Sequence, residues 1–184
     1  MQARKRVPRG EFVYADLGEE LTWLADNSVD VVLCQHVFSH LEMVTTPLNE
    51  FARVLDDGGD LLISTHNPIH EYLVVRDENY PSTGDEPEAT VETNSGSPDY
   101  AETERYDIHW GTDTLANRGT YYRRSIESLL SPLLAAGFEL QAVEEPTPDE
   151  AFAREHPELT RALRTHPPES ICLRATIGGS DTKQ

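Results

Sequence analysis

Hydrophobic residues along the chain alternate between short continuous runs and longer stretches with helical spacing. The run DVVLCQHV at 30–37 is apolar through its centre, which is typical of a parallel strand buried on both faces. The segment 46–58 opens with threonine and proline, repeats apolar residues at helical spacing and ends at a glycine pair, so it predicts a helix. DLLIST at 60–65 predicts the next strand. Strand, helix and strand in this order predict a crossover unit of a parallel sheet.

Further elements are predicted on both sides of this unit. EFVYADL at 11–17 has the β-branched and aromatic content of a short strand. A capping serine and a stripe of leucines predict a helix over 125–137, with Pro132 inside it, and 138–143 predicts a strand. A polar helix interrupted near Pro157 and a last strand at 170–177 complete the α/β pattern.

One long segment between these elements lacks a clear pattern. Residues 81–100 hold five acidic residues, no basic ones and many Ser, Thr, Gly and Pro, so they bury little apolar surface. We expect a polar, mobile insertion at about 78–118. The prediction is a single partial domain over 1–178, followed by a tail at 179–184.

The charge of the chain narrows the classes of partner. Its 184 residues include 15 Lys and Arg against 33 Asp and Glu, a formal charge of -18. Such a surface repels phosphate backbones and anionic lipid, so we expect neither nucleic acid nor membrane as a partner. Lys5 and Lys183 are the only lysines, and this carboxylate-rich, lysine-poor composition suits a halophile's surface. An ordinary acidic cytosolic protein is the alternative.

The cysteines and the chain's hydropathy predict a cytoplasmic protein. Cys34 and Cys172 both lie in apolar, strand-like runs, which suits buried thiols in a reducing compartment better than a disulfide. No run reaches the roughly 20 apolar residues that span a bilayer. The basic N-terminal residues lack the apolar core of a signal peptide.

Histidine spacing raises two chemical alternatives. His36 with His40, and His66 with His70, stand four residues apart, a spacing that zinc ligands use. No HExxH or CxxC motif accompanies them, so we expect no metal. Cys34 with a histidine would make a thiol and base pair, but a buried cysteine with no cation near it in sequence favours a structural thiol.

Several motifs together resemble a known family. FVYADL, ADNSVDVVLCQHVFSHLE and PLNEFARVLDDGGDLLIST are similar to the third, fourth and fifth strands of class I S-adenosylmethionine-dependent methyltransferases, of the type 11 or 25 kind. AAGFELQAVEEP and SICLRAT resemble the antiparallel pair that closes their sheet. The resemblance implies a Rossmann-like sheet of order 3-2-1-4-5-7-6, here lacking strands 1 and 2.

The resemblance also implies a cofactor and the residues that contact it. The cofactor is S-adenosyl-L-methionine. Asp16 and Leu17 correspond to the positions that read the adenine ring, by a carboxylate and a backbone N–H. Cys34, Gln35 and His36 correspond to the strand end beside the methionine part.

On the acceptor side, the resemblance implies methyl transfer to a small molecule. His66 and His70 lie just beyond a strand's carboxyl end and are candidate general bases. Tyr121, Tyr122 and Arg123 are candidates for a lid that faces the substrate, although the arginines at 118, 123 and 124 are more often solvated partners of an acidic surface than substrate clamps. A non-catalytic remnant or partner subunit is the alternative function.

The sequence departs from the family at its N-terminus. The first strand, its G-x-G-type turn and the second strand have no counterpart, and MQARKRVP resembles the end of the helix before the third strand. A truncated gene, a mis-called start or a fragment would each explain this. The run VDVVLC would then form an open edge, available for self-association, for a partner chain or for re-pairing with 12–17.

Overall fold

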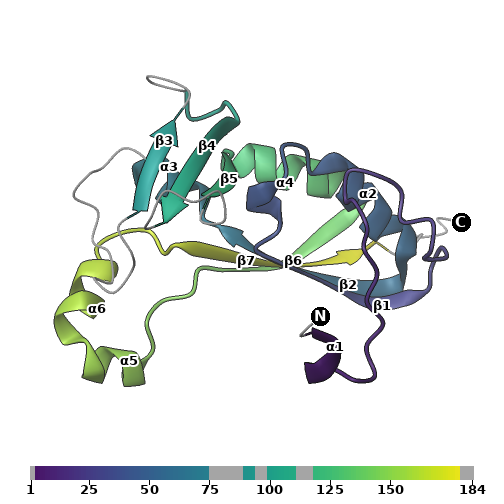
Figure 1. Ribbon diagram of the computed structural model, residues 1–184, viewed down its shortest axis with the longest axis horizontal. Helices are drawn as coiled ribbons and strands as arrows, with labels where there is room; N and C mark the ends of the chain where they lie inside the picture. Colours follow the sequence, from purple (N-terminus) through teal and green to yellow (C-terminus); the bar gives the residue numbers. More distant parts are fainter. Residues whose placement is uncertain (1–2, 75–88, 94–98, 111–117, 179–184) are drawn as a thin grey trace, which may run out of the picture.

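Two β-sheets of unequal size organise the chain in the computed structural model, which describes residues 3–74, 89–93, 99–110 and 118–178 (Figure 1). The larger sheet is mixed: its first pair is parallel, and the third strand is antiparallel to both of its neighbours. This confirms the predicted α/β fold with an antiparallel C-terminal pair. In spatial order the strands are β1 (Val29–Gln35), β2 (Leu55–His66), β7 (Ser170–Ile177) and β6 (Phe138–Glu144).

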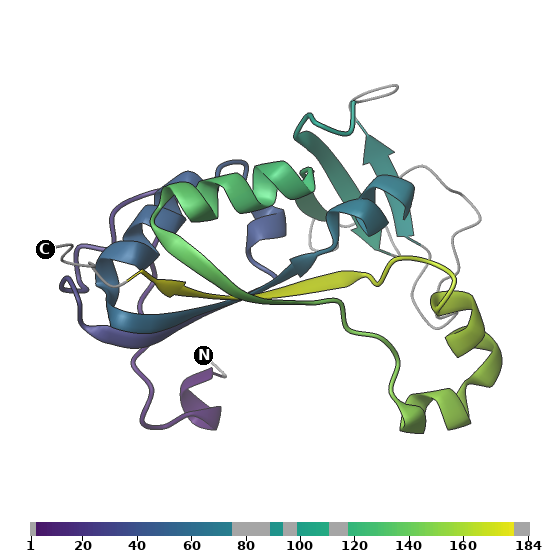
Figure 2. The ribbon, with the colours of Figure 1, turned by 180° about the vertical axis from the view of Figure 1, so that it is seen from behind.

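Two helices cover one face of this sheet (Figure 2). Helix α2 (Thr45–Val54) connects β1 to β2, and α4 (Ile126–Ala135) precedes β6. Ser125 caps α4, because its side chain accepts a hydrogen bond from the backbone N–H of Ser128 at 3.1 Å. Leu48 of α2 and Leu133 of α4 are almost fully buried in the core, together with Leu61 of β2. The apolar stripe of each helix therefore defines which face of the sheet is buried.

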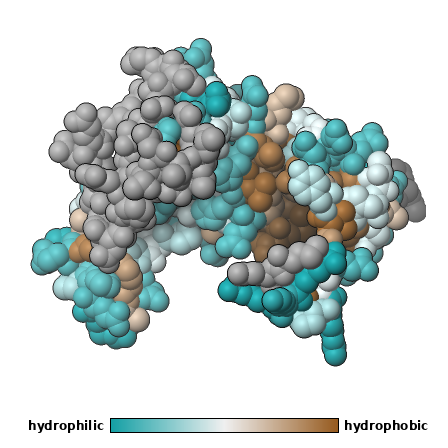
Figure 3. Space-filling model, in the orientation of Figure 1, coloured by the Kyte–Doolittle hydropathy of each residue, from teal (hydrophilic) through white to brown (hydrophobic). Residues whose placement is uncertain are grey.

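The opposite face of the sheet is partly uncovered. Along β1, Val31 is 50% exposed and Leu33 is 68% exposed, and Val143 of β6 is 50% exposed. The short helix α1 (Ala3–Arg6) lies on this side (Figures 1 and 2). Figure 3 shows hydrophobic residues gathered in a hollow above α1. Since parallel strands are normally buried on both faces, this surface is incomplete for a sheet of its kind.

β1 is also an edge strand among the described residues, because β2 is its one neighbour. An apolar open edge promotes association between chains.

We therefore expect the protein to self-associate in molar salt, where its charge is screened. Leu33→Lys should suppress this association and change the free energy of unfolding by no more than about 0.5 kcal/mol. Sedimentation velocity measures the association. Met43→Lys is the control, since Met43 is 67% exposed but lies outside the sheet, and equal association of the two variants would contradict the prediction.

The strand predicted at 11–17 is wrong: these residues form no strand and do not pair with β1. Phe12, Val13 and Tyr14 are exposed, from 37% at Phe12 to 102% at Tyr14, and Leu17 is half-buried. Two backbone carbonyls of this segment are satisfied locally: Phe12 accepts from Arg4 at 3.3 Å, and Asp16 accepts from the backbone N–H of Glu19 at 3.2 Å.

The loop that follows is held against α2. Arg53 donates hydrogen bonds to the carbonyl oxygens of Leu24 at 3.0 Å and Leu21 at 3.2 Å. The Glu50 carboxylate accepts from the backbone N–H of Leu21 at 2.7 Å and from Arg53 at 2.8 Å. These contacts fix the entry into β1.

A second, antiparallel sheet was not predicted. It consists of β3 (Ala89–Thr93), β4 (Glu104–Trp110) and β5 (Arg118–Arg123), in that order. It lies at the end of the molecule where β2 leads into α3 (Pro68–Val74) (Figure 1). The insertion predicted at 78–118 thus contains ordered strands. Its predicted mobility, like the predicted tail at 179–184, concerns residues outside the described ranges and stays a prediction.

A pair of short helices projects away from the main sheet in both ribbon views (Figures 1 and 2). They are α5 (Glu150–Glu155) and α6 (Pro157–Leu163), so the predicted polar helix is interrupted at Pro157 as expected. The Asp149 side chain caps α5 by accepting from the backbone N–H of Phe152 at 2.8 Å. No helix in the described ranges is long and apolar enough to cross a membrane.

Candidate functional site

Two histidines meet at the carboxyl ends of the parallel strands. His36 directly follows β1 and His66 ends β2, and their ring centroids are 5.5 Å apart. The backbone N–H of His36 donates to the carbonyl oxygen of Ser64 at 2.8 Å, which holds the two strand ends together. His36 has a φ of 51°, in the left-handed region that non-glycine residues seldom adopt. Such strained residues concentrate at functional sites.

A buried carboxylate holds the His66 ring. Glu71 on α3 lies with Oε1 at 2.8 Å from His66 Nδ1. The Tyr106 hydroxyl on β4 donates to the same oxygen at 2.5 Å. Because a carboxylate oxygen accepts, Nδ1 carries the proton and the neutral ring keeps its lone pair on Nε2. The two sheets are thus joined through one carboxylate.

The surroundings of His66 shift its pKa upward. Burial lowers the pKa of this imidazole, but the hydrogen bond and charge of Glu71, together with the charge of Glu169, outweigh burial and raise the pKa above its ordinary value. The side chain keeps 19% of its surface exposed. A raised pKa means that the His66 ring holds a proton more tightly than an ordinary imidazole, which favours proton transfer to it.

Aromatic rings line the site beside His66. The Tyr121 ring on β5 stacks on His66 at 5.5 Å and on Tyr106 at 5.5 Å. His40, in the 3₁₀ helix η1 (Phe38–His40), tilts against Tyr121 at 4.5 Å. His40 Nδ1 donates to the carbonyl oxygen of Thr120 at 3.0 Å, so the loop after β1 is joined to β5. Burial, and then the charge of Glu71, raise the pKa of Tyr121, so its hydroxyl stays protonated.

Arg124 fixes the loop that carries His40. Its guanidinium is buried, contrary to the expectation of a solvated arginine. It donates to three backbone carbonyl oxygens of this loop: those of Phe38 at 2.6 Å, Leu41 and Glu42. Burial is tolerated because both terminal nitrogens, Nη1 and Nη2, donate to backbone carbonyl oxygens.

Arg123 is fully buried, at 0% exposure, and this corrects its predicted place in a substrate-facing lid. Its Nε donates to Glu104 at 3.1 Å. The guanidinium also donates to the backbone carbonyl oxygens of Asp99 at 3.2 Å, Tyr100 at 3.2 Å and Glu102 at 3.1 Å. Arg123 therefore holds the second sheet together and does not face a ligand.

The sequence matches one family model. Residues 1–63 match the model described as a methyltransferase domain. This part of the chain, about a third of its length, is therefore similar to methyltransferase domains. A comparison with curated proteins finds no match.

Solved structures with the same fold include three methyltransferases. An S-adenosylmethionine-dependent methyltransferase from Mesorhizobium loti is 20% identical, with a TM-score of 0.61 over 96% of this chain and 75% of its own. One from Clostridium acetobutylicum is 10% identical, with a TM-score of 0.62 over 97% of this chain and 69% of its own. A Burkholderia thailandensis 1,6-didemethyltoxoflavin-N1-methyltransferase, with 1,6-didemethyltoxoflavin and S-adenosylhomocysteine bound, is 15% identical, with a TM-score of 0.51 over 96% of this chain and 55% of its own. At these identities the likeness shows the fold.

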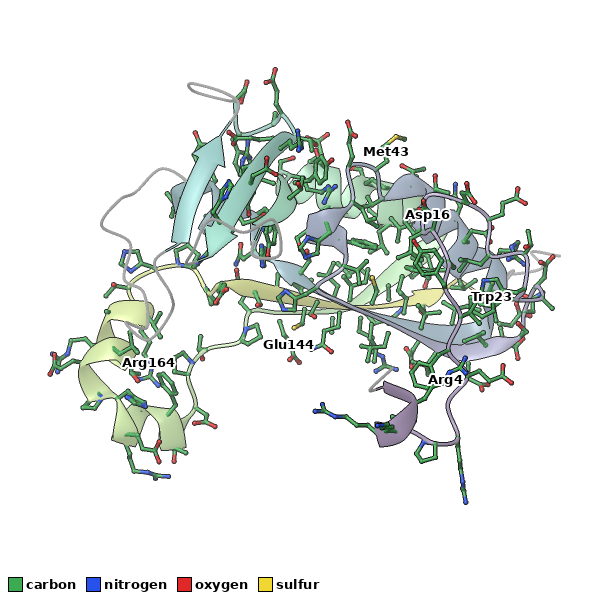
Figure 4. All side chains as sticks on the ribbon, viewed as in Figure 1. Arg4, Asp16, Trp23, Met43, Glu144 and Arg164 are labelled. Carbon is green, nitrogen blue, oxygen red and sulfur yellow. The ribbon has the colours of Figure 1, made fainter. Side chains whose placement is uncertain are left out.

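Two residues expected to read the adenine of the methyltransferase cofactor lie on an irregular loop. Asp16 is exposed (Figure 4), and its Oδ1 accepts from the backbone N–H of Gly18 at 2.8 Å. Leu17 is half-buried against the core. No strand supports either residue, so their expected role rests on the resemblance alone.

The three residues expected beside the methionine part differ in their placement. Cys34 faces the core, where burial raises the pKa of its thiol to about 12, so it is a neutral core residue. Gln35 is exposed at the end of β1. His36 is half-buried beside His66, where burial, and then the charge of His66, lower the pKa of its imidazole.

The described residues fit one end of the cofactor and not the whole of it. Gln35 and His36 stand at the strand end where the methionine part is expected. The segments that follow β1 and β2, residues 36–44 and 67–74, contain no glycine. The glycines with positive φ, Gly58 and Gly137, lie at the amino ends of β2 and β6. A glycine turn for the rest of the cofactor is therefore missing from these strand ends.

The remaining candidates are placed less favourably for chemistry. His70 is 8% exposed, and its Nδ1 donates to the carbonyl oxygen of Pro167 at 2.9 Å. Burial lowers the pKa of His70. Tyr122 is half-buried on β5. In the described ranges no group of three or more His, Cys, Asp or Glu residues is arranged to hold a metal ion.

Sequence reasoning found His66 and missed the residues that position it. Glu71 follows His66 by five residues, yet nothing in that spacing marks it as a partner. Tyr106 is 35 residues from Glu71 in sequence, in a segment expected to be an insertion. Both contacts depend on where the second sheet packs.

Proposed function

We propose that this chain is the acceptor-binding part of an S-adenosylmethionine-dependent methyltransferase that acts on a small molecule. The observation that carries the proposal is the convergence of His36, His66 and Tyr121 at the carboxyl ends of β1 and β2. In open α/β sheets ligands bind beyond these ends. The similarity of residues 1–63 to methyltransferase domains and the matching fold support the same conclusion.

In this proposal the chain's own residues bind and orient the acceptor. S-adenosyl-L-methionine supplies the methyl group, and the protein's contribution is mainly positioning. The Burkholderia thailandensis enzyme is a relative in fold whose bound ligand is a small molecule, which supports a small-molecule acceptor here. The acidic charge of -18 agrees with a partner other than nucleic acid or an anionic membrane.

We further propose that the glycine turn for the cofactor comes from a segment that pairs with β1. The β1 edge has no neighbour among the described residues, and Val31 and Leu33 next to it are 50% and 68% exposed. A strand added here would satisfy the free backbone groups, and its helix would cover the apolar face. The added strand would also place its glycine turn next to Gln35 and His36.

The second candidate function is a non-catalytic partner subunit that uses the same edge. It is favoured by the segments after β1 and β2, which contain no glycine. In that case the open edge would bind an intact methyltransferase chain and stabilise it.

The compartment proposed from the sequence is the cytoplasm of a salt-adapted cell. Cys34 and Cys172 are both free thiols, which supports a reducing compartment. With 33 acidic residues against 15 basic ones, molar salt relieves the self-repulsion of the chain, so it is the appropriate medium for the following experiment.

Calorimetry with S-adenosylhomocysteine in molar KCl tests the proposal. Two proteins are compared: the chain alone, and the chain fused at residue 1 to the glycine-rich strand, turn and helix of the Mesorhizobium loti methyltransferase. We expect binding and transfer of a labelled methyl group to small molecules by the fusion alone. A fusion with its turn glycines changed to valine is the control. A folded fusion that neither binds nor transfers would overturn the proposal and favour the partner subunit.

A further inference from the structure

The histidine cluster contains one ring nitrogen prepared to accept a proton from a ligand. His66 Nδ1 is committed to Glu71, which leaves the lone pair of the neutral ring on Nε2. Among the described residues Nε2 has no hydrogen-bond partner, and 19% of the side chain is exposed. An imidazole with a carboxylate at Nδ1 and a free Nε2 is arranged as a general base.

The neighbouring histidines lack this arrangement. His40 Nδ1 donates to the neutral carbonyl of Thr120, which stabilises an imidazolium less than a carboxylate does. The pKa of His36 is lowered by burial and then by the charge of His66. The base is therefore His66, and Glu71 stabilises the charge that develops on it.

Glu71 is itself held in one orientation. The Tyr106 hydroxyl donates to Glu71 Oε1 at 2.5 Å, and Tyr106 is 2% exposed. Burial, and then the charge of Glu71, raise the pKa of Tyr106, so the phenol remains a donor across the physiological range. Tyr106 acts on the base through Glu71 and is a positioning residue.

The charges around His66 select against anionic ligands. The carboxylates of Glu71 and Glu169 both act on the His66 ring. The two nearby guanidinium groups are occupied elsewhere: Arg123 by Glu104 and backbone carbonyls, and Arg124 by the carbonyls of the loop after β1. Within the described ranges, a ligand with a carboxylate or phosphate would meet negative charge at His66 without a free guanidinium group to pair with.

The rings at the site favour a flat ligand. His36, His66 and Tyr121 form a continuous series of rings, here called the aromatic wall, with centroid distances of 5.5 Å between successive rings. Tyr121 is 8% exposed and stacks on Tyr106 as well as on His66, so a ligand reaches the wall at His36 and at the exposed part of His66. Flat aromatic ligands stack on such walls or meet them edge to face. The aromatic wall and the base His66 together favour a ligand that is aromatic, uncharged and weakly acidic.

We infer, on the basis of the proposed function, that the acceptor is a neutral aromatic hydroxyl compound whose hydroxyl proton is taken by His66, with Glu71 and Tyr106 as positioning residues. In this step the O–H bond of the phenol breaks and its electron pair stays on the oxygen. The proton forms a bond to His66 Nε2, and the resulting imidazolium is paired with Glu71. The phenolate oxygen is then the nucleophile.

A phenol whose ionised form absorbs visible light tests this step without the cofactor. The probe is 4-nitrophenol, titrated with the unmodified chain in molar KCl between pH 5.5 and 8. We expect saturable binding by equilibrium dialysis, and a ratio of phenolate to phenol in the bound probe about tenfold above that of the free probe at the same pH. Benzoate, an aromatic anion of similar size, is expected not to compete.

Three variants separate proton transfer from binding. His66→Asn should keep the binding and lose the excess of phenolate, and Glu71→Gln should reduce that excess because the imidazolium loses its partner. Tyr106→Phe should move the pH profile without abolishing binding. His156→Asn is the matched control, since His156 is exposed on the projecting helices, and it should behave as the parent does. Circular dichroism confirms that each variant is folded.

The outcomes separate this inference from the proposed function. No binding of 4-nitrophenol, binding without excess phenolate, an unchanged His66→Asn variant or effective competition by benzoate would each overturn the inference. None of these readouts uses the cofactor. If the fusion protein did not bind the cofactor but the unmodified chain still gave excess phenolate, the methyltransferase proposal would be wrong. The inference that His66 takes a proton from a phenol would still stand.

Discussion

Replacing Arg123 by methionine is expected to lower the free energy of unfolding by about 3–5 kcal/mol. Arg123 is 0% exposed and pairs with Glu104 at 3.1 Å. The substitution keeps a similar apolar stem but leaves the Glu104 carboxylate buried without its cation. Chemical denaturation followed by circular dichroism in molar KCl measures the change.

An exposed ion pair provides the control for Arg123. Arg161 pairs with Glu158 at 2.6 Å, but their side chains are 72% and 81% exposed. Arg161→Met should therefore cost no more than about 1 kcal/mol. The double variant Arg123→Met/Glu104→Gln should recover part of the loss, because the buried charge of Glu104 that Arg123 balanced is removed as well. Equal effects of Arg123→Met and Arg161→Met would show that the second sheet does not depend on this pair.

The main sheet was predictable because its signals are local. DVVLCQHV and DLLIST are apolar runs with turn residues at their ends, and the helix between them has a proline in its first turn and an apolar stripe. The antiparallel strand pair at the C-terminus followed from similar short apolar runs. These strands and this helix were predicted correctly because the residues that determine each of them lie within about ten positions of one another.

Two errors arose where pairing partners are distant or missing. EFVYADL has the composition of a strand, but a strand forms only with a paired neighbour, and 11–17 pairs with no strand in the described part of the chain. Conversely, β4 reads ERYDIHW, which has no clean apolar alternation, and it forms because β3 and β5 pair with it. β-propensity depends on such neighbours more than on the segment itself.

The residues of the candidate site divide in the same way, into those that local sequence reveals and those whose partners are distant in sequence. His66 was found because it follows an apolar strand. The arginines at 123 and 124 were expected in solvent because sequence reports charge but not burial. Their compensation comes from backbone carbonyls up to 86 residues away, which no local pattern reveals. The partners of His66 on α3 and β4 were missed for the same reason.

Arg124→Met is expected to cost about 3 kcal/mol and to loosen the loop that carries His40. The substitution leaves the carbonyl oxygens of Phe38, Leu41 and Glu42 without the donor they share. A buried acceptor left unpaired costs about 1–3 kcal/mol. The Phe38 carbonyl keeps the backbone N–H of Leu41 at 3.2 Å, and Glu42 is exposed to water, so the total stays near the cost of one or two such acceptors. Denaturation in molar KCl measures the cost, and exchange of the His40 Nδ1 proton by NMR reports on the hydrogen bond to Thr120.

Two further arginine variants test whether Arg124 acts through its geometry. Arg124→Lys keeps the charge but lacks the planar fork that reaches several carbonyls at once, so it should restore only part of the stability and of the His40 protection. Arg164→Met is the control, because Arg164 is exposed and its contact with the Pro148 carbonyl is long, at 3.5 Å. If Arg124→Met left His40 exchange unchanged while lowering stability, the loop after β1 would be held by η1 and β5 alone. Faster exchange with Arg124→Met and not with Arg164→Met would instead show that a buried arginine sets the geometry of the aromatic wall beside His66.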